Sequence, residues 1–297
     1  MVTAPTEAPI RGTGAAPDPA IRPVVPALRW LYRPFAGLAV GATISLFGAS
    51  TRTDDAFAWT IAPPLTAALL GAAYAGALTI FVLALRETVW ANVRIAFFPP
   101  FVLATLMLIA TLLHLDKFHF GADPIPAAVA WIWLIVYIVV PPAMVVLFIL
   151  ELRTAGVDPP RTAPMAGWMR AVLAVYGVAA LVGGTALFVV PADIAPHWPW
   201  AITPLTGRAL AAWIVGLGVA AVLAFYERDL RRVRAGLWAF GVIGAAGLIA
   251  VARYADNLRG GIGTWLLVAV LAVMALLGVV AVVMERAKAT NRSRGCS

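Results

Sequence analysis

Eight long stretches of the chain contain almost no charged residue, and they limit what the chain can fold into. A membrane-spanning helix needs about 20 largely apolar residues. The stretches are 34–51, 61–85, 95–114, 125–150, 171–192, 205–226, 235–252 and 262–284. Of the 297 residues, 62% are apolar and 12% are charged, against about 45–50% and 25% in soluble domains. The sequence therefore predicts an all-α membrane protein with eight transmembrane helices and excludes a soluble or disordered chain.

The basic residues predict how the chain is oriented in the membrane. With eight spans, both termini lie on one side, and that side holds 17 of the 22 Lys and Arg residues. Cytoplasmic loops carry such an excess, so we expect both termini in the cytoplasm of a bacterial inner-membrane protein. This topology explains the net charge of +8 without nucleic acid, which we do not expect as a partner. The expected partner is the lipid bilayer, whose anionic headgroups attract these residues.

The two halves of the sequence resemble each other. Residues 64–121 align with residues 204–261 without a gap. The alignment pairs three sets of rare charges, namely Glu87 with Glu227, Arg94 with Arg234, and Asp116 with Asp256. Each copy holds four helices, an even number, so both copies enter the membrane from the same side. The sequence therefore predicts two parallel four-helix repeats.

The repeat and the polar ends predict five segments. They are a disordered cytoplasmic tail (1–27), a first four-helix repeat (28–153), a cytoplasmic linker (154–167), a second repeat (168–287) and a cytoplasmic tail (288–297). Small residues within the spans predict close helix packing; these are Gly37 and Gly41 in the first span and Gly241, Gly244 and Gly247 in the seventh. We expect a salt bridge within each of the equivalent loops that carry Glu87 with Arg94 and Glu227 with Arg234.

Aromatic residues near the spans have two interpretations each. Tyr137 precedes Pro141 and Pro142 in the fourth span, so we expect its hydroxyl to bond a carbonyl that these prolines leave free. The alternative is that Tyr137 lines a hydrophobic cavity for a lipid-like molecule. Trp200 lies just before the sixth span, where indole rings commonly sit at the membrane interface. Thr203 and Pro204 that follow predict a helix start, with Thr203 as the cap.

The predicted external face carries the remaining chemistry. His114, His119 and His197 lie there with several aspartates. Imidazole and carboxylate together can bind a transition metal, but the spacing matches no zinc motif, so we expect neither metal nor cofactor. Asp116 and Asp256, equivalent in the two repeats, are expected to cap the loops after the third and seventh spans.

Arg208 is an unexpected cation on this face. It lies in the first turn of the sixth span, and its counterpart in the first repeat is Ala68. One interpretation is that its side chain reaches lipid phosphate at the membrane surface. The other is that it pairs with Asp116, Asp256 or an anionic ligand.

Several of these residues resemble a known group. Trp198-Pro199-Trp200, then Thr203-Pro204-Leu205-Thr206 and Arg208, with His114-x-Asp116 and Phe118 upstream, resemble a family of uncharacterised bacterial polytopic membrane proteins. The resemblance implies a membrane protein of about eight spans and carries no activity with it.

The leading functional prediction is a permease-like protein, or one that handles lipids or other hydrophobic molecules. Its site would lie between the repeats near the external leaflet and take a hydrophobic or anionic small molecule. The residues expected to form it are Arg208, His114, Asp116, Asp256, Tyr137 and Trp200. One alternative is a non-catalytic assembly or sensor subunit. The other is a membrane enzyme that uses external His and Asp, although no catalytic motif is present.

Overall fold

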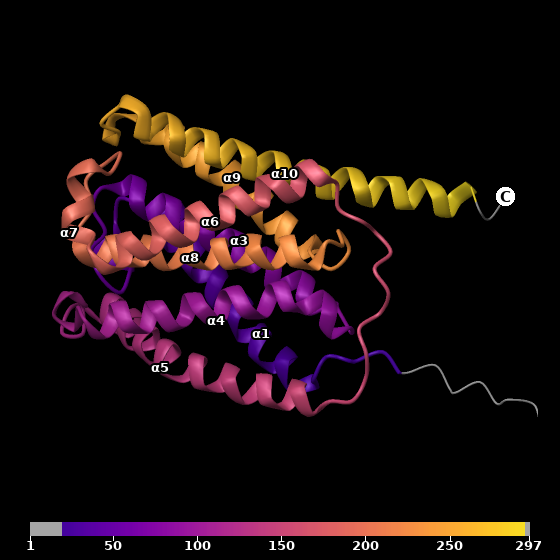
Figure 1. Cartoon of the computed structure of the whole chain (residues 1–297). Helices are drawn as coiled ribbons and strands as arrows, with labels where there is room; N and C mark the ends of the chain where they lie inside the picture. The colour runs from indigo at the N-terminus through magenta and orange to yellow at the C-terminus, as the bar shows by residue number, and fades with distance from the viewer. Residues whose placement is uncertain (1–19, 295–297) are drawn as a thin grey trace, which may run out of the picture.

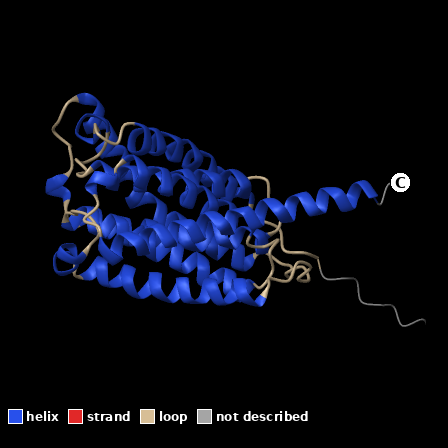
Figure 2. Cartoon of the chain, turned by 90° about the horizontal axis from the view of Figure 1, so that it is seen from above, coloured by secondary structure: helices blue, strands red, loops and turns tan. Residues whose placement is uncertain are grey.

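A computed structural model describes residues 20–294, apart from the side chains of residue 285 and of residues 287–294. The described chain is helical and contains no strand (Figure 2). The longer helices are α1 (Pro26–Thr43), α3 (Pro64–Ala84), α4 (Trp90–Leu112), α5 (Pro124–Arg153), α6 (Gly167–Val189), α8 (Pro204–Glu227), α9 (Arg234–Arg253) and α10 (Gly261–Arg294). Short helical turns join them; these are η1 (Ile44–Gly48), α2 (Thr53–Ala56), η2 (Leu115–Lys117), α7 (Pro191–Ile194), η3 (Ala195–His197) and η4 (Ala255–Asn257).

Seven of these helices are long and apolar enough to cross a membrane. They are α3, α4, α5, α6, α8, α9 and α10, and each coincides with a stretch that the sequence predicts. The prediction of an all-helical, multi-pass membrane protein is therefore confirmed. The predicted stretch 34–51 corresponds to α1 and the π-helical turn η1, but its helix already begins at Pro26. Arg29 and Arg33 in the first turns of α1 make that helix less apolar than the other seven.

Four helices form the centre of the bundle and four lie around it. α3 packs against α9, and α4 packs against α8. α1 covers α3, α6 covers α8, α5 covers α4, and α10 covers α9. Figure 1 shows α5 and α10 at opposite edges of the bundle. Since α5, α6 and α10 are buried over only about a third of their apolar windows, their outer faces are available to lipid chains.

Glycines bring α9 and α10 into close contact. A Cβ at Gly241 would lie 2.6 Å from the Cα of Gly278, and one at Gly244 would overlap the backbone of Ala275. The predicted packing role of Gly241, Gly244 and Gly247 is thus confirmed. The same prediction is wrong for Gly37 and Gly41 on α1, because nothing lies within 4 Å of a Cβ built on either residue.

The loops gather at two opposite ends of the bundle. We call them the Arg208 end, where α3, α5, α8 and α10 begin, and the Glu227 end, where α1, α4, α6 and α9 begin. At the Arg208 end, the Thr203 side chain accepts a hydrogen bond from the backbone N–H of Thr206 and Pro204 follows it. The predicted cap of α8 is confirmed.

An extended segment crosses the Glu227 end. The backbone N–H of Arg22 donates to the carbonyl of Val157 at 3.0 Å, and that of Val24 donates to Thr88 at 2.9 Å. Residues 20–27 were expected to belong to a disordered tail, and that expectation is wrong for them because these contacts and the first turn of α1 order them. The rest of that tail, residues 1–19, lies outside the described residues.

Candidate functional site

Arg208 and His114 meet at the Arg208 end. Arg208 lies in the first turn of α8, and His114 follows the end of α4, which packs beside α8. The guanidinium Nη1 of Arg208 lies 2.8 Å from Nε2 of His114. Arginine has only donors, so Nε2 accepts and the imidazole is the neutral form with its proton on Nδ1. Sequence reasoning placed both residues on one face but did not pair them.

The electrostatics of this pair favour a neutral histidine. Burial, and then the positive charge of Arg208, hold the pKa of His114 below its usual value. Among the described residues no carboxylate forms an ion pair with Arg208, and its Nε is buried without a hydrogen-bond partner. The pair is therefore a cationic site with an unused donor.

The two aspartates lie apart from Arg208. Asp116 pairs with Lys117 at 2.8 Å, and both side chains are exposed; this hydrogen bond from Lys117 lowers the pKa of Asp116. Asp256 is exposed in the equivalent turn after α9. Neither aspartate forms an ion pair with Arg208 among the described residues, so that expected pairing is not formed; the expected capping role stays a prediction.

Trp200 is buried inside the protein. Its side chain is 1% exposed, and its Nε1–H donates to the hydroxyl of Thr66 on α3 at 2.7 Å. The indole N–H therefore bonds the protein and not water or a lipid headgroup, while the interfacial depth of Trp200 stays a prediction. Its N–H finds a partner in the other half of the chain, which local sequence could not indicate.

Tyr137 of α5 bonds another tyrosine. Its hydroxyl lies 3.0 Å from that of Tyr74 on α3, so the expected bond to a proline-freed carbonyl is wrong. Trp213 of α8 packs edge-on against the Tyr74 ring, with centroids 5.0 Å apart. The bond between the two tyrosines uses one of their two hydroxyl hydrogens, and the Nε1–H of Trp213 is buried without a partner.

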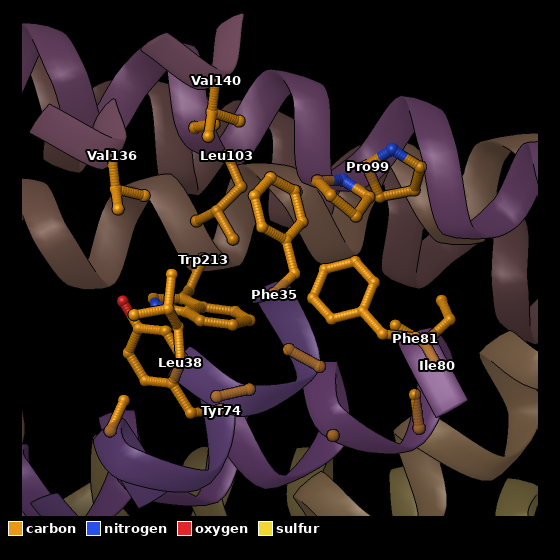
Figure 3. A pocket seen from close by; sticks show the side chains of 18 of the residues that line it. Phe35, Leu38, Tyr74, Ile80, Phe81, Pro99, Leu103, Val136, Val140 and Trp213 are labelled. Atoms are coloured by element: carbon orange, nitrogen blue, oxygen red, sulfur yellow. The ribbon is translucent and has the colours of Figure 1, made fainter. Parts of the chain in front are cut away.

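These aromatic residues line a cavity inside the bundle. The cavity has a volume of about 340 Å³. Its walls come from α1, α3, α4, α5, α8 and α9, and they are almost entirely apolar; Figure 3 shows Phe35, Leu38, Phe81, Leu103 and Val136 projecting toward it. Of the six predicted site residues, only Tyr137 lines it. Arg208, His114 and Trp200 lie outside, so the structure brings the predicted set together only in part.

The outer helices pack less tightly on the side of the bundle where the cavity lies. The glycines that let α10 approach α9 correspond in the alignment to Phe101, Ala104 and Met107 of α4. α5 packs on α4 over a smaller area than α10 packs on α9. The space left beside α4 is bounded by Pro99, Pro100 and Leu103.

A network of charges closes the Glu227 end. Glu227 accepts from Arg94 at 3.0 Å and from Arg232 at 2.7 Å, and Arg94 also bonds Asp158 at 2.6 Å. Arg234 pairs with Glu87 at 3.4 Å. The predicted salt bridges within each loop are wrong, because each arginine reaches across to the glutamate of the other half. Asp158 and Arg232 were missed, since neither belongs to the repeated pattern.

The remaining histidines do not gather around a metal-binding group. His119 lies 3.1 Å from the carbonyl of Phe57 and 3.1 Å from the hydroxyl of Thr60. His197 is exposed in a separate turn. Among the side chains that the structure describes, no three His, Cys, Asp or Glu are placed to hold a metal ion.

We compared the chain with protein-family models, with curated proteins and with solved structures, and no match was found.

Proposed function

We propose that this integral membrane protein binds a hydrophobic small molecule taken from the bilayer, as a permease or a lipid-handling protein does. The cavity of about 340 Å³ among six helices carries this proposal. Its volume falls at the lower end of small-molecule pockets, about 300–1,000 Å³. Such pockets combine apolar walls with a few polar groups, and here the Tyr74 and Tyr137 hydroxyls are those groups.

The site of this proposal differs from the one that the sequence predicts. The cavity lies at mid-depth of the bundle, between Tyr74 near the middle of α3 and Trp213 near the middle of α8. Arg208 and His114 form a separate contact point at the end of the bundle, suited to an anionic group such as a lipid phosphate.

The proposal includes eight spans in two parallel repeats. Each packing contact has a counterpart, with α1 on α3 matched by α6 on α8, α5 on α4 by α10 on α9, and α3 on α9 by α8 on α4. The ion pairs from Glu87 to Arg234 and from Arg94 to Glu227 are likewise exchanged between the halves. α1 with η1 also runs the length of the bundle. At one end Arg29 donates to the carbonyl of Glu87, and at the other the carbonyl of Phe47 accepts from Arg253.

The orientation is part of the same proposal. α1 begins at the Glu227 end, and the C-terminal part of α10 extends beyond the bundle at that end (Figure 1). Both therefore lie on one side, as an even number of spans requires. The excess of Lys and Arg predicts that this side faces the cytoplasm of a bacterial inner membrane.

A cavity-filling substitution tests the proposed function. Protein reconstituted into phosphatidylcholine vesicles is exposed to a long-chain alkyl ketone that carries a photoreactive diazirine, and labelled peptides are identified by mass spectrometry. We expect label on α5 and α8 at the cavity. Ala77→Phe places a ring in the cavity and should reduce this labelling severalfold. The control Ala179→Phe adds the same ring on the exposed face of α6 and should not. Equal labelling of the cavity peptides in folded Ala77→Phe and wild-type protein would refute the proposal.

A further inference from the structure

The cavity has an open side between α1 and α5. Gly37 and Gly41 of α1 line it, and both are exposed with nothing within 4 Å of a built Cβ. Leu38 beside them is 40% exposed. Across the cavity on α5, Ile132 also lines it and is 49% exposed. The residues that face the cavity from these two helices therefore also face the surroundings of the protein.

The packing of α1 and α5 leaves this side open. α1 is held by α3, and α5 is held by α4 and by the short helix α2. No packing contact of comparable extent joins α1 to α5, although both contribute walls to the same cavity. Apolar, exposed side chains at mid-depth of a membrane bundle meet lipid chains rather than water. The open side of the cavity consequently faces the hydrocarbon layer.

The polar groups inside the cavity include hydrogen-bond donors that have no acceptor. The Tyr74–Tyr137 pair leaves one hydroxyl hydrogen unused, and the neighbouring Trp213 N–H is buried without a partner. A donor without an acceptor is costly in an apolar environment. An oxygen atom on the occupant, such as a carbonyl or ether, would accept from the tyrosine pair.

We propose that the gap between α1 and α5 is a lateral entrance, through which an alkyl or isoprenoid chain bearing one oxygen acceptor enters the cavity from the bilayer. This rests on the proposed function and adds to it the route and the ligand class. Gly37 and Gly41 keep the α1 side of the entrance free of side chains. The oxygen of the chain takes the free hydrogen of the Tyr74–Tyr137 pair.

A tethered probe distinguishes lateral entry from entry through the ends of the bundle. A phosphatidylcholine with a diazirine within one acyl chain keeps its headgroup at the membrane surface, so its chain reaches the cavity only sideways. We expect it to label the cavity-facing residues of α5, between positions 129 and 140. Gly41→Phe should abolish this labelling by blocking the gap. Gly183→Phe is the matched control, because Gly183 on α6 also has nothing within 4 Å, and it should leave the labelling unchanged.

The outcomes separate the two proposals. If the free ketone labels the cavity and the tethered lipid does not, lateral entry is wrong and the proposed function stands. If neither probe labels the cavity, both fail. If folded Gly41→Phe protein is labelled by the tethered lipid as strongly as the wild type, the entrance does not lie between α1 and α5.

A second comparison tests the acceptor. The ketone probe should label the cavity roughly fivefold more than an alkane of matched length, as one hydrogen bond predicts. Replacing both tyrosines, Tyr74→Phe with Tyr137→Phe, should remove this preference while alkane labelling persists, because either tyrosine alone keeps one free hydroxyl hydrogen. An equal yield from ketone and alkane in the wild type would refute the acceptor.

Discussion

At the scale of single residues, the contact between Arg208 and His114 brings two cation-forming groups together without a carboxylate. The geometry is stable because only one of them is charged, with His114 accepting from the guanidinium. The lowered pKa of His114 has the same origin, since burial and the Arg208 charge both oppose an imidazolium. Protonating His114 would turn an attractive contact into a repulsive one.

Stability should therefore fall in mild acid through His114. The unfolded chain lacks the burial and the nearby charge, so it binds a proton near the usual pKa of about 6.5, before the folded state does. The contribution is fully present above this pH and is lost below it. We expect the melting temperature of the wild type to decrease between about pH 7 and 5.5, and His114→Gln to weaken that decrease.

His197→Gln provides the control for this pH dependence, because His197 is exposed. It should retain the wild-type slope. An unchanged slope in His114→Gln would mean that His114 does not titrate differently in the folded and unfolded states.

At the scale of elements, the outer helices differ in how closely they pack on the central ones. Gly241, Gly244 and Gly247 allow α10 to lie directly on α9. α5 packs less extensively on α4, and the cavity lies beside these two helices. The looser packing of α5 on α4 thus coincides with the space in which an apolar molecule would fit.

Gly244→Ala should separate α9 from α10. The added Cβ would overlap the backbone of Ala275 and Leu271, and backbone atoms cannot move aside as a side chain can. We expect a loss of about 1–3 kcal/mol in unfolding free energy, measured by reversible unfolding in bicelles. Gly183→Ala on the open face of α6 should be neutral or stabilising by up to ~1 kcal/mol, since alanine favours helix. Equal effects of the two substitutions would contradict the close packing.

At the scale of the whole molecule, the halves are joined through exchanged contacts. α3 belongs to the first half but packs on α9, and α4 packs on α8. The ion pairs also join the two halves, because Glu227 pairs with Arg94 and Glu87 pairs with Arg234. Neither half could bury its central helices without the other.

Glu227→Ala should destabilise the molecule far more than Glu87→Ala. Glu227 is buried between Arg94 and Arg232, and removing one partner of a buried ionic cluster costs about 3–5 kcal/mol. The Glu87 pair is longer, at 3.4 Å, and partly exposed; with the bond that Glu87 accepts from Asn92 at 3.0 Å, its loss should cost about 1–2 kcal/mol. Unfolding free energies of the two variants in the same bicelles measure the difference. Equal costs would show that burial does not set the strength of these equivalent pairs.

The sequence determined the class of the protein and the positions of seven spanning helices. A charge-free run of about 20 residues has one stable state in a bilayer, the helix, which bonds all of its own backbone groups. Local chemistry also determined the Thr203 cap and the packing role of Gly244. The start of the first helix was not predicted correctly. Arginines in its first turns interrupt the charge-free stretch, so the sequence does not show that the helix begins at Pro26.

Only the tertiary structure decided how these helices use their side chains. Trp200 bonds Thr66, Tyr137 bonds Tyr74, and Arg94 reaches Glu227, each across more than 60 positions of sequence. Hydropathy does not determine which apolar helices pack together in a membrane, since lipid chains solvate every apolar helix face equally well. Shape and scattered polar contacts make that choice, and they act only once the helices meet. The cavity has the same origin, because it is the space that remains between helices once they have packed, and the sequence of each helix alone does not show it.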